Sequence, residues 1–185
     1  MTRKIIVGVA VAAVAAFALA WMLSPILAAQ ALIRAGKTGD VRRIEQLVDF
    51  PSLRASLKHE LNDELIERMR RDPRVVESGL GGLGMMLAPM LLAGAVDTLV
   101  TPEVVANMVT TAEAPDPSKP RSPDPAGKRD GNDIHQSWGY RSLNQFAVTL
   151  TARDRPEDHL ALILERRGLF AWKLAAVDLQ SAPAT

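Results

Sequence analysis

"FAVTLTARDRPEDHLALILERRGLFAWKLAAVDL" (residues 146–179) is the stretch of the chain that decides its fold. Large apolar side chains recur there at every second position, which is typical of β-strands with one buried face. The segment 154–158 is predicted to turn between the first two of three antiparallel strands. Arg167 and Gly168 are predicted to form a tight hairpin between the last two, with Gly168 at positive φ. The inward-facing residues are expected to be Phe146, Val148, Leu150, Leu160, Leu162, Leu164, Trp172 and Leu174.

Upstream of these strands the apolar period changes from two residues to about four, which indicates helices. The predicted helices cover residues 24–36, 41–48, 51–71 and 85–100, and a last one follows Thr101. Ser24 and Asp40 are predicted N-caps. The helix that begins at Ser24 is expected to continue from the preceding apolar helix, with a break at Pro25. No strand, helix and parallel strand follow one another, so we expect an α+β fold in which several helices pack on a small C-terminal antiparallel sheet.

The N-terminal segment is predicted to insert into a membrane. Residues 5–23, "IIVGVAVAAVAAFALAWML", carry no charge and are long enough to cross a hydrocarbon core as a helix. We expect a retained transmembrane anchor over residues 1–28, because Trp21 stands where an interfacial aromatic side chain would lie. The soluble part is then expected in the periplasm, attached to the inner membrane by a single pass. The alternative is a signal peptide cleaved near Ala20, which would release the protein into the periplasm.

Residues 29–185 are predicted to form a single extracytoplasmic α+β domain. Inside it, residues 112–134 contain five prolines and few apolar side chains. Such a composition has too little to bury to support folding, so this segment is predicted to be a disordered linker.

Composition and motifs argue against several classes of function. Lys and Arg total 22 against 21 Asp and Glu, so no strong positive field attracts nucleic acid, and no nucleic-acid partner is expected. The chain has no cysteine, which removes disulfides and thiolate ligands. Gly79, Gly81 and Gly84 have the G-x-G-x-x-G spacing of a dinucleotide site, but a charged helix end precedes them instead of a strand. We therefore predict no cofactor, no metal and no catalytic residues.

Three segments resemble a bacterial family of uncharacterised proteins known as DUF2939. They are "SPILAAQALIRAGKTGDVRRIEQLVDFPSLRASLK" (24–58), "LVTPE" (99–103) and "LERRGLFAWKL" (164–174). The resemblance implies a membrane-anchored or exported protein and transfers no catalytic residue. The order of helices followed by a bent antiparallel sheet is also similar to cystatin-like and NTF2-like folds.

The sequence hypothesis for function is an envelope protein that binds a partner protein or an apolar ligand without catalysis. An apolar groove is predicted between the helix 85–100 and the sheet, lined by Met85, Met86, Met90, Leu91, Phe146 and Trp172. The alternative is that these six side chains form part of the hydrophobic core and line no groove. The alternative functions are an enzyme with a cone-shaped cavity and a membrane-associated structural or assembly factor.

Overall fold

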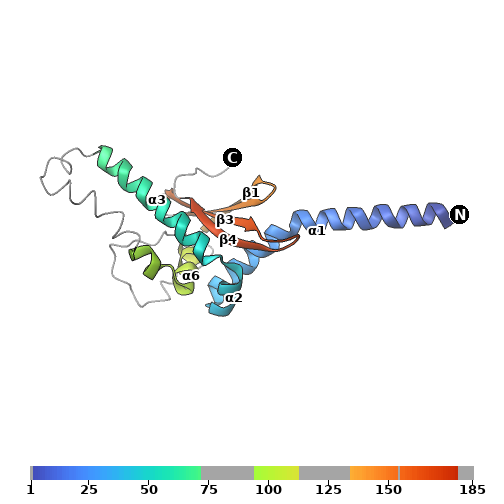
Figure 1. Ribbon diagram of the computed structural model, residues 1–185, viewed down its shortest axis with the longest axis horizontal. Helices are drawn as coiled ribbons and strands as arrows, with labels where there is room; N and C mark the ends of the chain where they lie inside the picture. The colour runs from blue at the N-terminus through green and yellow to red at the C-terminus, as the bar shows by residue number, and fades with distance from the viewer. Residues whose placement is uncertain (1, 72–93, 113–133, 154, 179–185) are drawn as a thin grey trace, which may run out of the picture.

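The computed structural model describes residues 2–71, 94–112, 134–153 and 155–178 of the chain (Figure 1). Its elements in chain order are α1 (Thr2–Thr38), α2 (Val41–Leu47), α3 (Phe50–Arg71), α6 (Pro102–Thr111), β1 (Ile134–Ser142), β2 (Gln145–Ala152), β3 (Arg155–Arg166) and β4 (Trp172–Asp178). Residues 94–99 are also helical. The glycine motif at 79–84 and nearly all of the predicted linker lie outside the described residues. The predicted α+β class is confirmed.

The sheet has four antiparallel strands in the order β1-β2-β3-β4, one more than predicted. The missed strand, β1, is "IHQSWGYRS", in which only Ile134 is buried and the other residues are partly or largely exposed. Its core-facing side includes Gln136, so the apolar alternation is interrupted. The remaining signal was the pair Trp138 and Tyr140, which lie opposite Val148 and Phe146 of β2.

Both turns between the predicted strands differ from expectation. The turn before β3 is shorter than 154–158, because β2 ends at Ala152 and β3 begins at Arg155. The last two strands are joined by a five-residue loop, 167–171, which is closed by a 2.8 Å hydrogen bond from Arg167 N–H to Ala171 O. The chain reversal is spread over five residues, so Gly168 has no need of the positive φ of a two-residue turn, and it does not adopt one.

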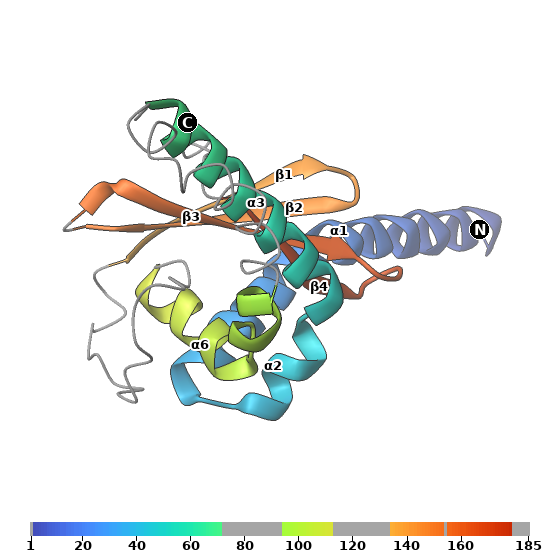
Figure 2. The same ribbon diagram turned by 60° about the vertical axis from the view of Figure 1, so that its left-hand side comes forward.

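One face of the sheet forms the core with the helices. The predicted alternation is confirmed, since the eight expected inward-facing side chains are all buried in this core. A bulge between β3 and β4 at Ala175 shifts the register, so that Val177 lies on the same face as Leu174. Buried side chains from α1, α2, α3 and α6 complete the core, among them Leu32, Ile44, Leu57 and Val105. Figure 2 shows α3 crossing the sheet beside β4.

The helix ends follow local rules with one exception. Asp40 and Thr101 accept hydrogen bonds from backbone N–H groups of the first turns of α2 and α6, as N-caps do. The predicted end of a helix at Gly36 is wrong, because α1 runs on to Thr38 and Gly39, at φ +64°, follows it. Gly36 instead lies where α6 comes close: a side chain there would stand 3.4 Å from Ala106 O.

The outer edge of β4 is covered by α3 and by the residue before it. Asp49 N–H donates to Leu174 O over 2.8 Å. The Ser56 hydroxyl bonds both the N–H and the C=O of Val177, each over 3.1 Å. An uncovered edge strand offers unpaired backbone groups to other chains, and these contacts remove that opportunity along β4.

Candidate functional site

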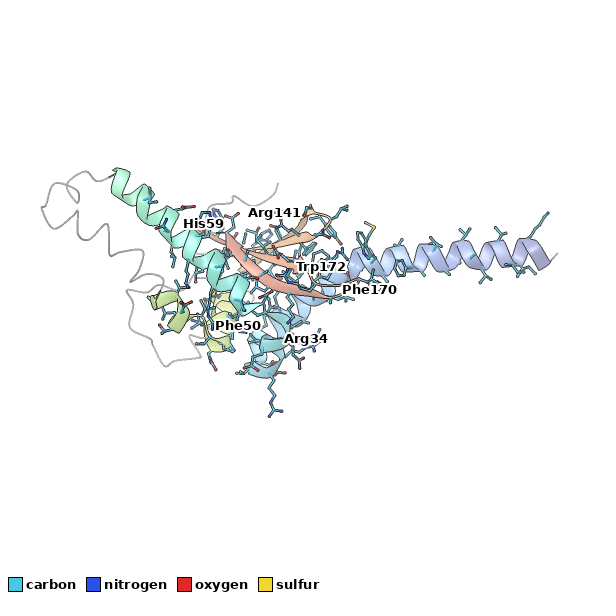
Figure 3. All side chains as sticks on the ribbon, viewed as in Figure 1. Arg34, Phe50, His59, Arg141, Phe170 and Trp172 are labelled. Carbon is cyan, nitrogen blue, oxygen red and sulfur yellow. The ribbon has the colours of Figure 1, made fainter. Side chains whose placement is uncertain are left out.

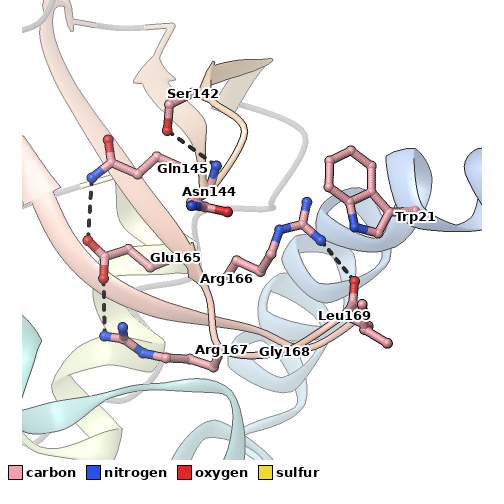
Figure 4. Close-up of a pocket in the computed structure, with 9 residues that line it drawn as sticks. All are labelled: Trp21, Ser142, Asn144, Gln145, Glu165, Arg166, Arg167, Gly168 and Leu169. Carbon is pink, nitrogen blue, oxygen red and sulfur yellow. Dashed lines mark hydrogen bonds and ion pairs between the residues drawn. The ribbon is translucent and has the colours of Figure 1, made fainter.

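A pocket of about 580 Å³ lies at the end of the domain where α1 leaves it (Figure 4). It is lined by Trp21, Ser142, Asn144, Gln145, Glu165, Arg166, Arg167, Gly168 and Leu169. These residues come from α1, from the turn between β1 and β2, and from the end of β3 with the loop after it. Its volume falls in the range of small-molecule sites, but its lining is mainly polar.

The sequence predicts a break at Pro25, yet α1 passes through it as one helix. Proline has no N–H, so the carbonyl four residues earlier, that of Trp21, loses its helical donor. The Ser24 hydroxyl donates to this carbonyl over 2.8 Å and replaces the missing bond. The Ser24 Oγ in turn accepts a 2.8 Å hydrogen bond from Trp172 Nε1 in the buried interior. Ser24 is therefore not an N-cap but the link between the proline site of α1 and strand β4.

Strand β1 holds the same part of α1. The Tyr140 hydroxyl donates to Met22 O over 2.6 Å. Its ring makes an edge-to-face contact with Trp172, with centroids 6.2 Å apart. Both edge strands of the sheet thus contact the turn of α1 that contains Pro25, and the direction in which the helix leaves the domain is fixed by these contacts.

Arg166 connects the pocket to this joint. Its guanidinium carbon lies 4.0 Å from the ring centroid of Trp21 and 4.2 Å from that of Trp172, so the cation is held between two indoles. Its nitrogens donate to Leu143 O, at 3.1 and 3.3 Å, and to Leu169 O, at 2.8 Å. One side chain therefore binds the helix and both turns at this end of the sheet.

Arg167 forms the second charged group of the pocket. It donates to Asp49 Oδ2, with Nη2 at 2.8 Å, and lies 3.1 Å from Glu165 Oε2. Desolvation acts to raise the pKa of Asp49, but hydrogen bonds from Ser52 and Arg167 outweigh it, and the pKa lies below its ordinary value. The guanidinium of Arg167 is therefore shared by two carboxylates, so the pocket presents little net charge to a ligand.

The arrangement does not assemble a catalytic group among the described residues. Glu165 is the only acidic side chain in the lining, and it is held by Arg167 and by Gln145 Nε2 at 3.4 Å. No set of three His, Asp or Glu residues in the described part of the chain could hold a metal ion. The polar groups at hand are the amides of Asn144 and Gln145 and the Ser142 hydroxyl, which suit binding by hydrogen bonds.

The opposite face of the sheet carries a small apolar cluster of Ala147, Ala161 and Ile163. Above this face Arg141 of β1 and Asp178 of β4 form a 2.8 Å ion pair. These strands are the two edges of the sheet and would lie about 14 Å apart if it were flat, so the pair indicates that the sheet curls toward this side. Asp178 is thus engaged by an arginine.

Two residues of the predicted apolar groove lie in the hydrophobic core. Phe146 and Trp172 are 2% and 3% exposed and belong to the core. Met85, Met86, Met90 and Leu91 lie outside the described residues, so the groove itself stays a prediction. Sequence reasoning marked Trp21 only as an interfacial aromatic and gave Arg166 no role. The signal for Arg166 was its place in "LERRGLFAWKL", where it ends the strand before the hairpin and Trp172 begins the strand after it.

Comparison with known proteins identifies a family. A sequence model described as "Protein of unknown function (DUF2939)" matches residues 14–108, slightly more than half of the chain. The search of curated proteins found no match. The search of solved structures found none either, so the similarity to cystatin-like and NTF2-like folds stays a prediction.

Proposed function

The chain belongs to the DUF2939 family, whose function is unknown, and we propose that it is a single-pass membrane-anchored binding protein without catalytic activity of its own. The folded domain is held at the extracytoplasmic surface of the inner membrane. The pocket beside Trp21 receives a segment of a partner protein that approaches along this surface.

The observation that carries the proposal is that one helix serves both the anchor and the domain. Residues 4–20 of α1 are exposed along their whole length and apolar from Ile5 onward. Ala29, Leu32, Ile33 and Ala35, farther along the same helix, are buried in the domain core. The helix is long and apolar enough to cross a membrane, and residues 5–23 would span about 28 Å, close to the thickness of a hydrocarbon core. A soluble protein would have to leave this apolar surface in water.

The chemistry of the pocket favours a polypeptide over an apolar ligand. Asn144, Gln145 and Ser142 offer both donors and acceptors, which match the alternating N–H and C=O groups of a peptide backbone. The indole of Trp21 adds one flat wall. An apolar ligand would leave these polar groups without partners, at a cost of about 1 to 3 kcal/mol for each one that is desolvated.

Anchoring is tested by fractionation of cells that express the full chain. We expect the protein in the membrane fraction after an alkaline carbonate wash, with residues 1–20 still attached, and with its domain open to protease added from the periplasmic side. A soluble product that begins at Trp21 would refute the anchor. A domain protected from that protease would refute its orientation.

The binding site is tested with a photoreactive benzoylphenylalanine at Asn144, which is exposed at the pocket. The matched control carries the same group at Lys37, which is also exposed but lies 16 residues after Trp21 on α1, about 24 Å along the helix. We expect discrete protein adducts from position 144, and we expect them to be lost when Gln145→Ala is added. Equal adducts from both positions would argue against a specific site.

A further inference from the structure

Two turns present exposed apolar side chains at the end of the domain from which α1 emerges. Leu143, at the tip of the β1–β2 turn, is 72% exposed. Leu169 and Phe170, in the loop between β3 and β4, are 66% and 45% exposed. Figure 3 shows Phe170 beside α1, whereas His59 of α3 lies away from that helix. Large apolar side chains gathered at one end of a molecule indicate a surface that meets something other than water.

The contact of the loop 167–171 with α1 sets the depth of that loop relative to the membrane surface. The rings of Phe170 and Phe17 meet edge to face with centroids 5.4 Å apart. Phe17 lies four residues before Trp21, which is about 6 Å along the helix axis toward the middle of the apolar segment. If Trp21 lies at the membrane surface, Phe17 lies within the bilayer, and a ring that touches Phe17 lies at or below the same surface.

Several backbone carbonyl groups of the two turns are hydrogen-bonded within the protein, as a place with little water requires. Unpaired carbonyl groups are costly in lipid. Arg166 donates to the carbonyls of Leu143 and Leu169, and Arg167 N–H closes the second loop on Ala171 O. The charge of Arg166 is itself covered by the indoles of Trp21 and Trp172. Neither turn, 143–144 or 167–171, contains an acidic residue that would have to be desolvated.

We propose that these two turns dip into the interfacial layer of the bilayer that α1 crosses, so that Leu143, Leu169 and Phe170 form a second contact with lipid beside the anchor. The proposal rests on the anchor of the proposed function. The occupant of this apolar surface is the membrane itself, because the surface continues directly from the exposed apolar side of α1 and a ring on it touches the helix within the expected span.

The experiment uses the absence of native cysteine in the full chain. Single cysteines replace Leu143 or Leu169, are labelled with the polarity-sensitive dye NBD, and are studied in phosphatidylglycerol–phosphatidylethanolamine vesicles. Two further positions serve as references: Val11→Cys in the middle of the apolar segment, and His59→Cys, whose native side chain is 76% exposed on α3. Lipids with a spin label on the acyl chain are then added as quenchers.

We expect blue-shifted emission and a clear loss of fluorescence at Val11, Leu143 and Leu169, with neither change at His59. If Val11 is quenched but Leu143 and Leu169 behave as His59 does, the anchor stands and the contact of the turns with lipid is refuted. Quenching at one turn only refutes the two-turn contact. If Val11 is not quenched, the anchor fails, and the inference fails with it.

Discussion

Trp172→Ala should be among the most damaging substitutions in this domain, because Trp172 joins three elements. The side chain is 3% exposed, stacks on Arg166, meets Tyr140 and donates to Ser24. Truncation of a buried Trp to Ala costs about 3 to 5 kcal/mol through lost burial and the cavity that remains. The free energy of unfolding of a domain is about 5 to 15 kcal/mol, so the expected loss is about a fifth of it or more.

The substitution Trp172→Phe separates the contribution of the hydrogen bond to stability from the contribution of the buried ring. It keeps most of the apolar volume and removes only the N–H that reaches Ser24, so we expect a loss of about 1 to 2 kcal/mol. Ser24→Ala removes the partner of this bond and also leaves the carbonyl of Trp21 unpaired. Because both substitutions break the same bond, the double variant should lose about 1 kcal/mol less than the sum of the two.

Amide hydrogen exchange of the full chain in lipid nanodiscs, read on peptides from β3 and β4, measures these losses. Exchange in the N-terminal half of α1 serves as an internal control, since the proposed membrane anchor would hold that helix independently of the domain. A loss from Trp172→Ala no larger than that from Trp172→Phe would refute the buried role of the ring. Strict additivity of Ser24→Ala and Trp172→Phe would refute the hydrogen bond between them.

Three further outcomes are expected. Asp49→Asn should lower stability at neutral pH and flatten its acid dependence, because the pKa of Asp49 is lower in the folded chain. The carboxylate stabilises the fold above its ordinary pKa of 3.8, and this contribution is lost as the pH falls through the folded value. A urea midpoint that falls equally in the wild type and in the variant between pH 7 and 3 would contradict this. Ser56→Ala should cost about 1 kcal/mol and speed amide exchange at Val177, whose N–H it bonds, while a substitution at exposed Lys37 should leave that amide unchanged. Leu57→Asp places an unpaired charge in the core and should cost about 3 to 5 kcal/mol, abolishing protection in α3 and β4 together; loss in α3 alone would show that the helix and the sheet unfold separately.

The sheet could be predicted where burial imposes a period of two on the sequence. Phe146, Val148 and Leu150 alternate with smaller or polar residues because one face of β2 packs on the helices. Strand β1 lies at an edge, where packing on the core constrains fewer side chains, and a polar Gln136 on its core-facing side hides the period. Strand assignment from sequence therefore succeeded for β2, β3 and β4 and failed for β1.

The candidate site could not be predicted because its residues depend on contacts between distant parts of the chain. Ser24 before Pro25 has the local sequence of a helix start, and nothing near it reveals that an indole 148 positions later will bind its oxygen. Arg166 and Trp21 are likewise 145 residues apart and meet only when β3 returns to the helix. Local patterns report a residue's neighbours along one element, so a site built from α1, two turns and β3 was not visible to them.

The unbroken course of α1 through Pro25 makes the proposed anchor a spacer of fixed length and phase. Each residue of a helix turns the chain by about 100° and advances it by about 1.5 Å. One residue inserted between Trp21 and Ala29 would therefore swing the two apolar turns about a quarter turn around the helix and away from the phenyl ring of Phe17. Seven inserted residues would restore the phase but raise the domain by about 10 Å. With the proposed anchoring, the helix sets both the height of the pocket above the lipid and the direction in which the pocket faces.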